Sequence, residues 1–370
     1  MGFGRPVWAE INLSAIRSNM REIMSLIKPG TFFCPVIKAD GYGHGAVPIA
    51  HEAVALGAHY LAVAISAEAI QLRDSGITLP ILVLGYTPPE MASMIVGNNL
   101  TQTVYRKEHV DALSAAATAL NKTVKVHVKV DTGMTRLGIT PEDTAEFCAY
   151  VVSQPNIELE GVFTHFATAD SSDKTLAQGQ LSRFMSAIGS VSAKGLNVKL
   201  RHCANSAAVL DIPEAHLDMV RPGIILYGLR PSDETGQPFD LQPAMRLKAR
   251  LSMVKSVGTG RAVSYGARYV TDKPTMIATI PLGYADGYSR MLSGKAEICV
   301  DGMRAPVIGR ICMDQCMADV SHIPSVKEGQ EILLFGGPDL PADEIALHLG
   351  TINYEVVCMV GKRVPRLYIK

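Results

Sequence analysis

The sequence has no excess of either charge sign. Lys and Arg number 35 among its 370 residues, and Asp and Glu also number 35, so the formal net charge is zero. This balance creates no general field that would attract nucleic acid or an anionic membrane surface. Apolar runs of the ~18 residues needed to cross a bilayer are also missing, because Gly, Pro or a charge interrupts every stretch. We therefore expect a soluble protein whose partners are small molecules or other protein chains, with no nucleic acid and no membrane among them.

The sequence also lacks signals for secretion, for a disulfide framework and for a metal site. Its start, Met1 to Glu10, has no basic segment followed by an apolar stretch, and Pro6 breaks the myristoylation pattern that Gly2 would begin. The seven cysteines are odd in number and contain no C-x-x-C pair, which argues against disulfides and a zinc knuckle. We expect a cytoplasmic protein with no structural metal.

Hydrophobic residues make up 48% of the chain, which is enough for at least one full core. From about Thr31 to Arg221, short apolar runs alternate with longer helix-like stretches. We predict eight strands in this region: Phe32–Lys38, Tyr60–Ile65, Ile81–Leu84, Leu100–Val104, Val124–Val130, Ile157–His165, Val198–Cys203 and Leu217–Arg221. Eight strands with crossover helices between them predict an α/β fold with an N-terminal (β/α)8 barrel of the TIM type. A doubly wound open sheet is the competing interpretation, but Gly41–Gly45 does not give the G-x-G-x-x-G turn that such a sheet usually carries.

The pattern changes after a polar linker that spans Ser232 to Pro238. Between Ala244 and Met253, apolar and charged residues alternate, which predicts an antiparallel strand with one solvated side. Further strands are predicted at Thr275–Pro281, Ala296–Val300 and Glu331–Phe335, with one helix at Pro341–Leu349. We therefore expect a barrel domain over residues 1–240 and a mostly β domain over residues 241–370. The first ~10 residues are candidates to pack with the second domain.

Polar side chains end several of the predicted barrel strands, where barrel enzymes build their active sites. These residues are Lys38, Lys129, His165, His202 and Arg221. In Val124 to Val130 the valines alternate with Lys125, His127 and Lys129, which places the valines against the helices and the polar residues in the lumen. A buried lysine is costly unless it is paired or chemically altered. Any one of these residues could be a structural ion pair or a solvated strand end, but the joint pattern favours an active site.

Two chemistries fit a barrel mouth that is rich in lysine and histidine. A binuclear metallohydrolase would use a modified lysine and histidines as metal ligands, but it usually carries a His-x-His pair on the first strand. Here that strand ends in Lys38 with no histidine beside it. A Schiff-base lysine that holds pyridoxal 5′-phosphate fits better.

The segment Val36-Ile37-Lys38-Ala39-Asp40-Gly41-Tyr42-Gly43-His44-Gly45 closely resembles the pyridoxal-lysine motif of alanine racemases. Later blocks resemble the same family in the same order, among them Lys129–Met134, Arg136–Gly138, Thr164–Ala167, Asn205-Ser206, Arg221–Gly223, Val263–Gly266, Gly283–Gly287, Cys312–Gln315 and Tyr354-Glu355. The likeness runs from Ala9-Glu10-Ile11 to Arg363–Arg366. It implies a pyridoxal-phosphate enzyme that interconverts L- and D-alanine.

The resemblance also implies the catalytic pair. Inverting a carbon centre requires a proton to leave one face of a planar carbanion and another to arrive on the opposite face. Lys38, which holds the cofactor until substrate displaces it, is implied for one face and Tyr265 for the other. Free tyrosine is a poor base at neutral pH, since its pKa is about 10. His165 resembles the polar neighbour that stabilises the phenolate.

Other residues match positions around the cofactor and the substrate. Arg221 resembles the donor to the pyridine nitrogen, and His202 resembles the residue that orients Arg221. The residues that match the phosphate site and its surroundings are Tyr42, Asn205, Ser206, Gly223, Ile224 and Tyr354. Arg136 and the backbone N–H of Met313, with Asp314 beside it, resemble the group that holds the substrate carboxylate. The residue that matches Lys129 is carbamylated in several family members, and Tyr284, Ile352 and Tyr354 resemble a constriction that limits side chains to methyl size.

The family resemblance finally implies a homodimer with shared active sites, in which Tyr265 of one subunit reaches Lys38 of the other. A racemase of broader specificity, for example one acting on serine, is the first alternative. A non-catalytic pyridoxal-phosphate carrier and a barrel-type decarboxylase fit less well, because the second domain carries Tyr265 and because Arg221 stands where a decarboxylase would have a carboxylate. D-Alanine supply for peptidoglycan and D-alanine breakdown both remain open.

Overall fold

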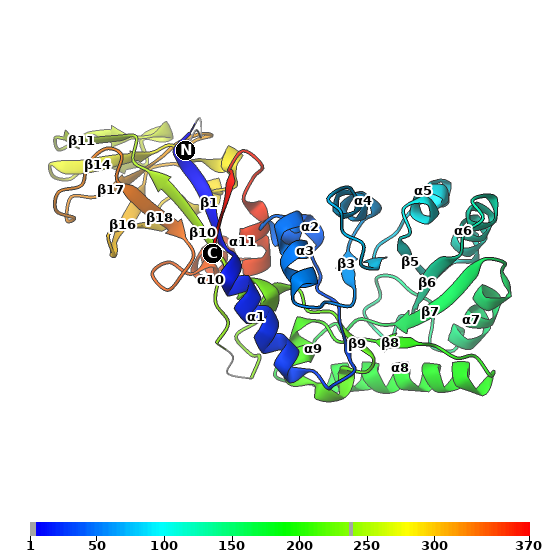
Figure 1. Cartoon of the computed structure of the whole chain (residues 1–370). Coiled ribbons are helices and arrows are strands. Elements are labelled where there is room, and N and C mark those ends of the chain that lie inside the picture. Colours follow the sequence, from blue (N-terminus) through cyan, green and yellow to red (C-terminus); the bar gives the residue numbers. More distant parts are fainter. Residues whose placement is uncertain (1–4, 237–239) are drawn as a thin grey trace. The chain divides into compact units, whose positions relative to one another are not determined.

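The computed structural model describes residues 5–236 and 240–370, so Met1–Gly4 and part of the predicted linker, including Pro238, lie outside it. The chain forms two compact units (Figure 1). Unit 1 comprises the chain up to Ala15, a short insertion at Tyr42–Gly45, and Pro243–Lys370. Unit 2 comprises Ile16–Gly41 and Ala46–Gln242.

Unit 2 contains the predicted barrel. Its eight strands are β2 (Phe32–Phe33), β3 (Leu61–Val63), β4 (Ile81–Val83), β5 (Thr101–Val104), β6 (Val124–Lys129), β7 (Ile157–Phe163), β8 (Leu200–His202) and β9 (Met219–Val220). Strands β3 to β8 form a six-stranded parallel sheet in chain order, and β2 pairs with β9. The eight strands coincide with the eight predicted apolar runs, although each strand is shorter than its predicted run.

Backbone hydrogen bonds close these strands into a ring. A parallel bridge between Val36 and Ala62 joins the end of β2 to β3. On the other side, the N–H of Arg221 donates to the carbonyl of Ala204 at 3.0 Å, which joins β9 to β8. The prediction of a TIM-type barrel is therefore confirmed, and the open doubly wound sheet is excluded.

Helices cover the outside of the strands (Figure 1). They include α3 (Ala46–Ala55), α4 (Ser66–Asp74), α5 (Ala92–Gly97), α6 (Lys107–Ala119), α7 (Thr144–Ser153) and α8 (Thr175–Ala193). Helix α1 (Leu13–Leu26) begins in unit 1 and continues in unit 2 from Ile16 onward. In α8, residues Ala177, Phe184 and Val191 recur at heptad spacing and are buried, so one stripe faces the barrel. Among the described residues, no helix is long and apolar enough to cross a membrane.

The alternation predicted for β6 is confirmed. Val124, Val126 and Val128 are buried on the side that faces the helices. On the opposite side, His127 lies against His202, with ring centroids 4.9 Å apart, and Lys129 lies over the Phe163 ring. The polar residues of β6 therefore point into the lumen.

Unit 1 is built on a nine-stranded sheet in the order β11-β14-β17-β16-β15-β18-β10-β1-β19. The strands are β1 (Val7–Asn12), β10 (Met245–Arg250), β11 (Met253–Val257), β14 (Thr275–Ile280), β15 (Glu297–Val300), β16 (Met303–Ile308), β17 (Cys316–Asp319), β18 (Glu331–Phe335) and β19 (Arg366–Ile369). A separate hairpin joins β12 (Ala262–Val263) to β13 (Tyr269–Val270), and the unit has two helices, α10 (Ala342–Leu349) and α11 (Asn353–Met359). The mostly β second domain is thus confirmed in character.

Several details differ from the sequence prediction. The run Ala244–Met253 was predicted as one strand, but it is divided between two: β10 ends at Arg250 and β11 begins at Met253. Strand β1 was not predicted; it pairs with β10 and β19. The insertion at Tyr42–Gly45 belongs to unit 1, where Nε of Arg366 donates to the carbonyl of Gly43 at 3.0 Å.

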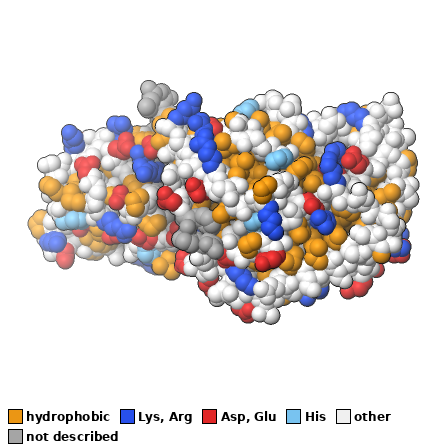
Figure 2. Space-filling model, turned by 60° about the horizontal axis from the view of Figure 1, so that its bottom comes forward, with side chains coloured by type: hydrophobic (Ala, Val, Ile, Leu, Met, Phe, Trp, Pro, Cys, Tyr) orange, Lys and Arg blue, Asp and Glu red, His pale blue; other side chains and the backbone are white. Residues whose placement is uncertain are grey.

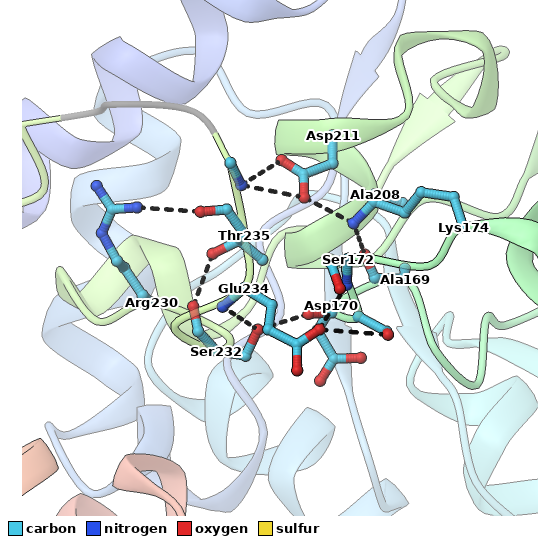
Figure 3. Close-up of polar contacts among 12 residues, drawn as sticks. Ala169, Asp170, Ser172, Lys174, Ala208, Asp211, Arg230, Ser232, Glu234 and Thr235 are labelled. Atoms are coloured by element: carbon cyan, nitrogen blue, oxygen red, sulfur yellow. Dashed lines mark hydrogen bonds and ion pairs between the residues drawn. The ribbon is translucent and has the colours of Figure 1, made fainter.

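The segment that leaves the barrel is tied to the loop after β7 (Figure 3). The Glu234 carboxylate accepts from the N–H of Ser172 at 2.6 Å. Asp211 accepts from Nζ of Lys174 at 2.7 Å and from the N–H of Gly236 at 3.3 Å.

On the face shown in Figure 2, basic and acidic side chains are interspersed, in keeping with the neutral net charge.

Candidate active site

Lys38 begins a left-handed turn at the mouth of the barrel. The short segment α2 (Lys38–Tyr42) has positive φ angles at Ala39 (51°), Asp40 (53°) and Gly41 (61°), followed by Tyr42 at 52°. Left-handed backbone costs a non-glycine residue roughly 1–2 kcal/mol, so the surrounding structure must hold this turn in place. Strained backbone of this kind gathers at functional sites.

Glu68, on α4, is the residue that fixes this turn. Its Oε1 accepts from the N–H of Ala39 at 2.6 Å, and its Oε2 accepts from the N–H of Ala64 at 2.9 Å. Asp40 accepts from the N–H of Ala46 at 2.8 Å on the other side of the turn. Sequence reasoning missed Glu68, because a glutamate in the first turn of a helix usually only complements the helix dipole.

Lys129 ends β6 inside the barrel and is only 6% exposed. Its Nζ has no hydrogen-bond partner among the described residues and lies 4.7 Å from the centre of the Phe163 ring. Burial first, and then the positive charges of Arg221 and Arg136, bring the pKa of Lys129 well below its usual range. Burial and the neighbouring cations thus both favour the neutral amine over the ammonium.

Arg136 is exposed on the loop that follows β6. The Asp131 carboxylate organises this loop by accepting from the N–H groups of Gly133, Met134 and Thr135, each at 3.0 Å. Burial disfavours the charge of Asp131, but these three donors lower its pKa below the usual range.

His165 is the residue around which the charges of the mouth converge. Its pKa lies well below the usual range because burial disfavours the imidazolium and because neighbouring cations repel it. These cations are Arg221, Lys129, Arg136 and Lys38. The structure therefore brings five of the residues singled out from the sequence into one electrostatic neighbourhood, which is suited to an anionic ligand.

Arg221 lies deeper in the lumen and is 3% exposed. Its Nη1 donates to Nδ1 of His202 at 2.5 Å, and its Nη2 donates to the carbonyl of Thr164 at 2.8 Å. Burial lowers the pKa of Arg221 to about 10, so the guanidinium stays charged at neutral pH. The expected contact between His202 and Arg221 is present.

Two helix starts meet near the end of β8. Helix α9 (Ser206–Asp211) is capped by Asn205, whose side chain accepts from the N–H of Ala208. The 3-10 helix η3 (Ile224–Tyr227) starts after Gly223, whose N–H donates to Oγ of Ser206 at 2.8 Å. The two helix starts are therefore joined, and they gather backbone N–H groups of the kind that bind phosphate.

Unit 1 assembles a second set of the predicted residues. The rings of Tyr42 and Tyr354 lie 6.1 Å apart, centre to centre. Gly43 allows the close approach between the insertion and α11, since a Cβ there would lie 2.3 Å from the carbonyl oxygen of Val357. Ile352, directly before α11, is 57% exposed.

Tyr265 stands on a strained turn between β12 and β13 and is 67% exposed. The preceding Ser264 has φ 65° and ψ −175°, a conformation that is almost restricted to glycine. Oγ of Ser264 donates to the carbonyl of Arg310 at 2.6 Å and contacts Sγ of Cys312 at 3.4 Å. A fixed backbone therefore presents an exposed phenol.

The segment after Cys312 links this turn to the other predicted residues of unit 1. The N–H groups of Tyr284 and Ala285 donate to the carbonyls of Cys312 and Met313 at 3.1 and 3.0 Å. A Cβ at Gly283 would lie 2.2 Å from the Cys312 oxygen, so this packing needs glycine. Asp314 accepts from Arg363 at 2.6 Å, as part of the same loop cluster.

Comparison with known families decides what these two sets of residues belong to. The model described as "Alanine racemase, N-terminal domain" matches residues 11–231, and the one described as "Alanine racemase, C-terminal domain" matches residues 244–368. The chain belongs to the alanine racemase family.

Individual relatives agree with this assignment. The alanine racemase of Desulfovibrio desulfuricans is 66% identical over 370 residues, which is 100% of both chains. That of Desulforamulus reducens is 51% identical over 98% of this chain and 99% of its own. Among solved structures, the alanine racemase of Clostridium difficile 630 superposes with a TM-score of 0.96 at 44% identity, covering 99% of this chain and 96% of its own.

Full-length relatives at this identity establish the activity: the protein is an isomerase that racemises alanine. The metallohydrolase and the decarboxylase suggested as alternatives by the barrel are thereby excluded. The carrier built on the barrel alone is excluded too, because the second family model covers nearly all of the C-terminal region.

One feature of unit 1 was not foreseen. A hollow of about 680 Å³ beside the Tyr265 turn is lined by three arginines, Arg268, Arg290 and Arg310, together with Tyr269. These arginines come from separate loops, and nothing in their sequence spacing relates them to each other.

Proposed function

We propose that the barrel mouth binds pyridoxal 5′-phosphate through Lys38 and that Lys38 and Tyr265 are the two proton-transfer groups of the racemase. The observation that carries this proposal is the convergence of Lys38, Lys129, Arg136 and Arg221 on His165. Such a site suits a ligand pair with two anionic groups, a phosphate and a carboxylate.

The residues present fit this cofactor. The joined starts of α9 and η3 would supply N–H groups and the Ser206 hydroxyl for the phosphate. The family resemblance assigns Tyr42 and Tyr354, whose rings lie close together in unit 1, to the same phosphate. Arg221 is a charged donor that suits the pyridine nitrogen, and Asn205 holds the α9 start in shape. When bound, pyridoxal phosphate supplies the electron-withdrawing system that makes the α proton of an amino acid removable.

The protein side chains then divide the proton transfers. Lys38 would hold the cofactor, and its Nζ would remove or return the proton on one face of the substrate carbon. Tyr265 of the partner subunit serves the opposite face, with His165 as its proposed polar neighbour. The exposure of Tyr265 on a rigid, strained turn supports a role toward a second copy of the chain.

A mixing experiment tests the paired roles and the homodimer together. Lys38→Ala and Tyr265→Ala proteins should each be inactive, because each lacks one of the two proton-transfer groups. Mixed dimers should regain one intact site of two. Should no ratio of the two proteins restore racemisation, the sharing of sites would be refuted.

Arg136 and Met313 are proposed to hold the substrate carboxylate, with Lys129 behind Arg136 and Asp314 beside Met313. The buried, unpartnered Nζ of Lys129 fits a carbamate, because a neutral amine adds carbon dioxide with release of a proton and becomes an anion. The mass of carbon dioxide on the peptide that carries Lys129, under conditions that preserve carbamates, would support this. An unmodified Lys129 side chain in a crystal structure would refute it.

Substrate size is proposed to be limited by Tyr284, Ile352 and Tyr354. The alternative is a racemase that also accepts serine, and rates measured on alanine, serine and larger amino acids separate the two.

We further propose that the enzyme works in the cytoplasm, where it supplies D-alanine for peptidoglycan. All seven cysteines are free in the structure, which supports a reducing compartment.

A further inference from the structure

A single line of hydrogen bonds runs down the barrel lumen from Arg221. Its Nη1 contacts Nδ1 of His202 at 2.5 Å. Nε2 of His202 contacts Nδ1 of His127 at 2.8 Å, and Nε2 of His127 contacts Oε2 of Glu160 at 3.3 Å. All four side chains are buried, at 3% exposure or less. The line thus joins a guanidinium to a carboxylate through two imidazoles.

The two ends of this line decide where its protons lie. A guanidinium can only donate, and a carboxylate can only accept. Because Nδ1 of His202 must accept from Arg221, the proton of His202 lies on Nε2 and is donated to His127. Nδ1 of His127 is then an acceptor, and its Nε2–H donates to Glu160. Only one arrangement satisfies every contact: both histidines neutral and protonated on Nε2.

Burial supports this arrangement. The pKa of His127 is below its usual range and that of His202 well below, in both cases mainly because burial disfavours the charged ring. An imidazolium on either ring would place two donors against each other within the line. The positive charge therefore stays on Arg221.

A bulge in the backbone builds the lower end of the line. Between β6 and β7 the register shifts, so that Val126 pairs with Leu159 and His127 pairs with Gly161. Glu160 is the extra residue of this bulge, and bulges redirect side chains. A Cβ at Gly161 would lie 2.7 Å from Nδ1 of His127, so this glycine provides the space that the imidazole occupies.

Donors surround the Glu160 carboxylate. Nζ of Lys125 contacts Oε1 at 2.5 Å, and the Tyr60 hydroxyl contacts Oε2 at 2.6 Å. Lys199 lies 3.8 Å from Oε1. Burial alone would raise the pKa of Glu160, but His127, Lys125 and Tyr60 hold it down to about 2. Glu160 is therefore a carboxylate at neutral pH.

We propose that Glu160 is a positioning residue for Arg221: by accepting from His127 at the lower end of the line it holds both histidines in the tautomer that Arg221 needs, and so keeps Nδ1 of His202 free to accept from the guanidinium. This inference rests on the proposed function, in which Arg221 meets the cofactor ring. If a donor replaced Glu160, the line would reverse. Nδ1 of His202 would then carry a proton against Arg221, and the guanidinium would lose its hold.

The test exchanges the charges at the lower end of the line. In the double variant Glu160→Lys with Lys125→Glu, the ion pair is kept but a donor faces His127. Lys125→Met is the matched control, because it removes a partner of the same carboxylate that lies outside the line. Glu160→Gln is the conservative variant, since its amide oxygen can still accept from His127.

The first readout is nitrogen-15 NMR of the holoenzyme labelled at histidine. In the wild type, Lys125→Met and Glu160→Gln, we expect both His127 and His202 as neutral Nε2–H tautomers; in the double variant we expect Nδ1–H. Retention of Nε2–H in the double variant would overturn the proposal. Should that variant fail to fold, Glu160→Met carries the test through kcat. Loss of the acceptor at the lower end should weaken the hold on Arg221 and lower kcat, and a wild-type kcat in Glu160→Met would overturn the proposal.

The second readout is kinetic. Since Arg221 acts on the cofactor rather than on alanine, the double variant should lose kcat by about tenfold or more, with KM changed by no more than about twofold. Reversed tautomers with an unchanged kcat would also count against the proposal. Failure of the proposed function would give a different result. The wild type would then show no borohydride-reducible absorbance band from a cofactor bound to Lys38, while the histidine tautomers would be unchanged.

Discussion

The lumen of the barrel and the loops around Tyr265 hold their functional groups in opposite ways. In the lumen, Arg221, His202 and Glu160 are buried and are fixed by one another through side-chain hydrogen bonds. In unit 1, the Tyr265 side chain is 67% exposed, and only the backbone around it is fixed, through Ser264 and Arg310. The lumen therefore specifies protonation as well as position, whereas the turn specifies position alone.

This difference separates stability from activity. A change in the lumen disturbs buried polar groups, which are costly to leave unpaired, so it should affect folding and catalysis together. Tyr265 is largely exposed, so removal of its hydroxyl should affect catalysis alone. Substitutions in each region can break or sharpen this contrast.

The largest expected effect is on activity. Tyr265→Phe should reduce kcat/KM by about 10²- to 10⁴-fold, because it removes the proposed proton-transfer group on one face. The free energy of unfolding should change by less than ~0.5 kcal/mol, because the hydroxyl is exposed. Racemisation assays and chemical unfolding on the same preparations check both. Tyr86→Phe is the control, an exposed tyrosine in unit 2 that should change neither quantity.

A destabilised Tyr265→Phe protein would break the contrast, since the hydroxyl would then hold the turn together. An active Tyr265→Phe protein with normal stability would instead remove Tyr265 from the mechanism.

A second prediction concerns two glycines of unit 2. Gly161→Ala places a Cβ 2.7 Å from Nδ1 of His127 and should destabilise the protein by about 1–3 kcal/mol, since the imidazole or the bulge must shift. Gly189→Ala, in α8, meets nothing within 4 Å and should be neutral or stabilise by up to ~1 kcal/mol. Urea unfolding measures the change in unfolding free energy for both variants. Equal changes would show that the lumen accommodates an added Cβ at Gly161 without strain.

The sequence predicted the barrel well because its signals are local. Apolar runs mark all eight strands, and the alternation in β6 places Lys125, His127 and Lys129 in the lumen. The motif blocks also named the residues that the structure gathers around His165 and around the Tyr265 turn.

What the sequence did not reveal depends on contacts between distant elements. In Ile-Glu-Leu-Glu-Gly, Glu158 and Glu160 occupy equivalent positions of an alternating strand, yet Glu158 is exposed and Glu160 is buried. The register shift against β6 makes the difference, and no local pattern encodes it. Glu68 was missed for the same reason, because its partner Ala39 lies in a turn whose left-handed conformation is not apparent from its residues.

The smallest predicted effect is a pH dependence of stability that arises from Glu160. Its pKa falls from 4.5 to about 2 on folding, so its contribution of about 3 kcal/mol is complete above pH ~5 and is lost as the pH falls toward 2. Glu160→Gln does not titrate at this position. The gap in unfolding free energy between wild type and Glu160→Gln should therefore narrow by about 1 kcal/mol between pH 7 and pH 4.

Urea unfolding of the two proteins at several pH values measures this gap, and Glu234→Gln serves as the control. Glu234 is also a carboxylate with a lowered pKa, held mainly by the N–H of Ser172, but it lies on the surface, where solvent screens its interactions. The difference in unfolding free energy between wild type and Glu234→Gln should stay small across the same pH range. If the difference in unfolding free energy between wild type and Glu160→Gln were constant with pH, the carboxylate would be no better stabilised by its donors in the folded lumen than by water. The contrast between the lumen and the exposed turn would then rest on packing alone.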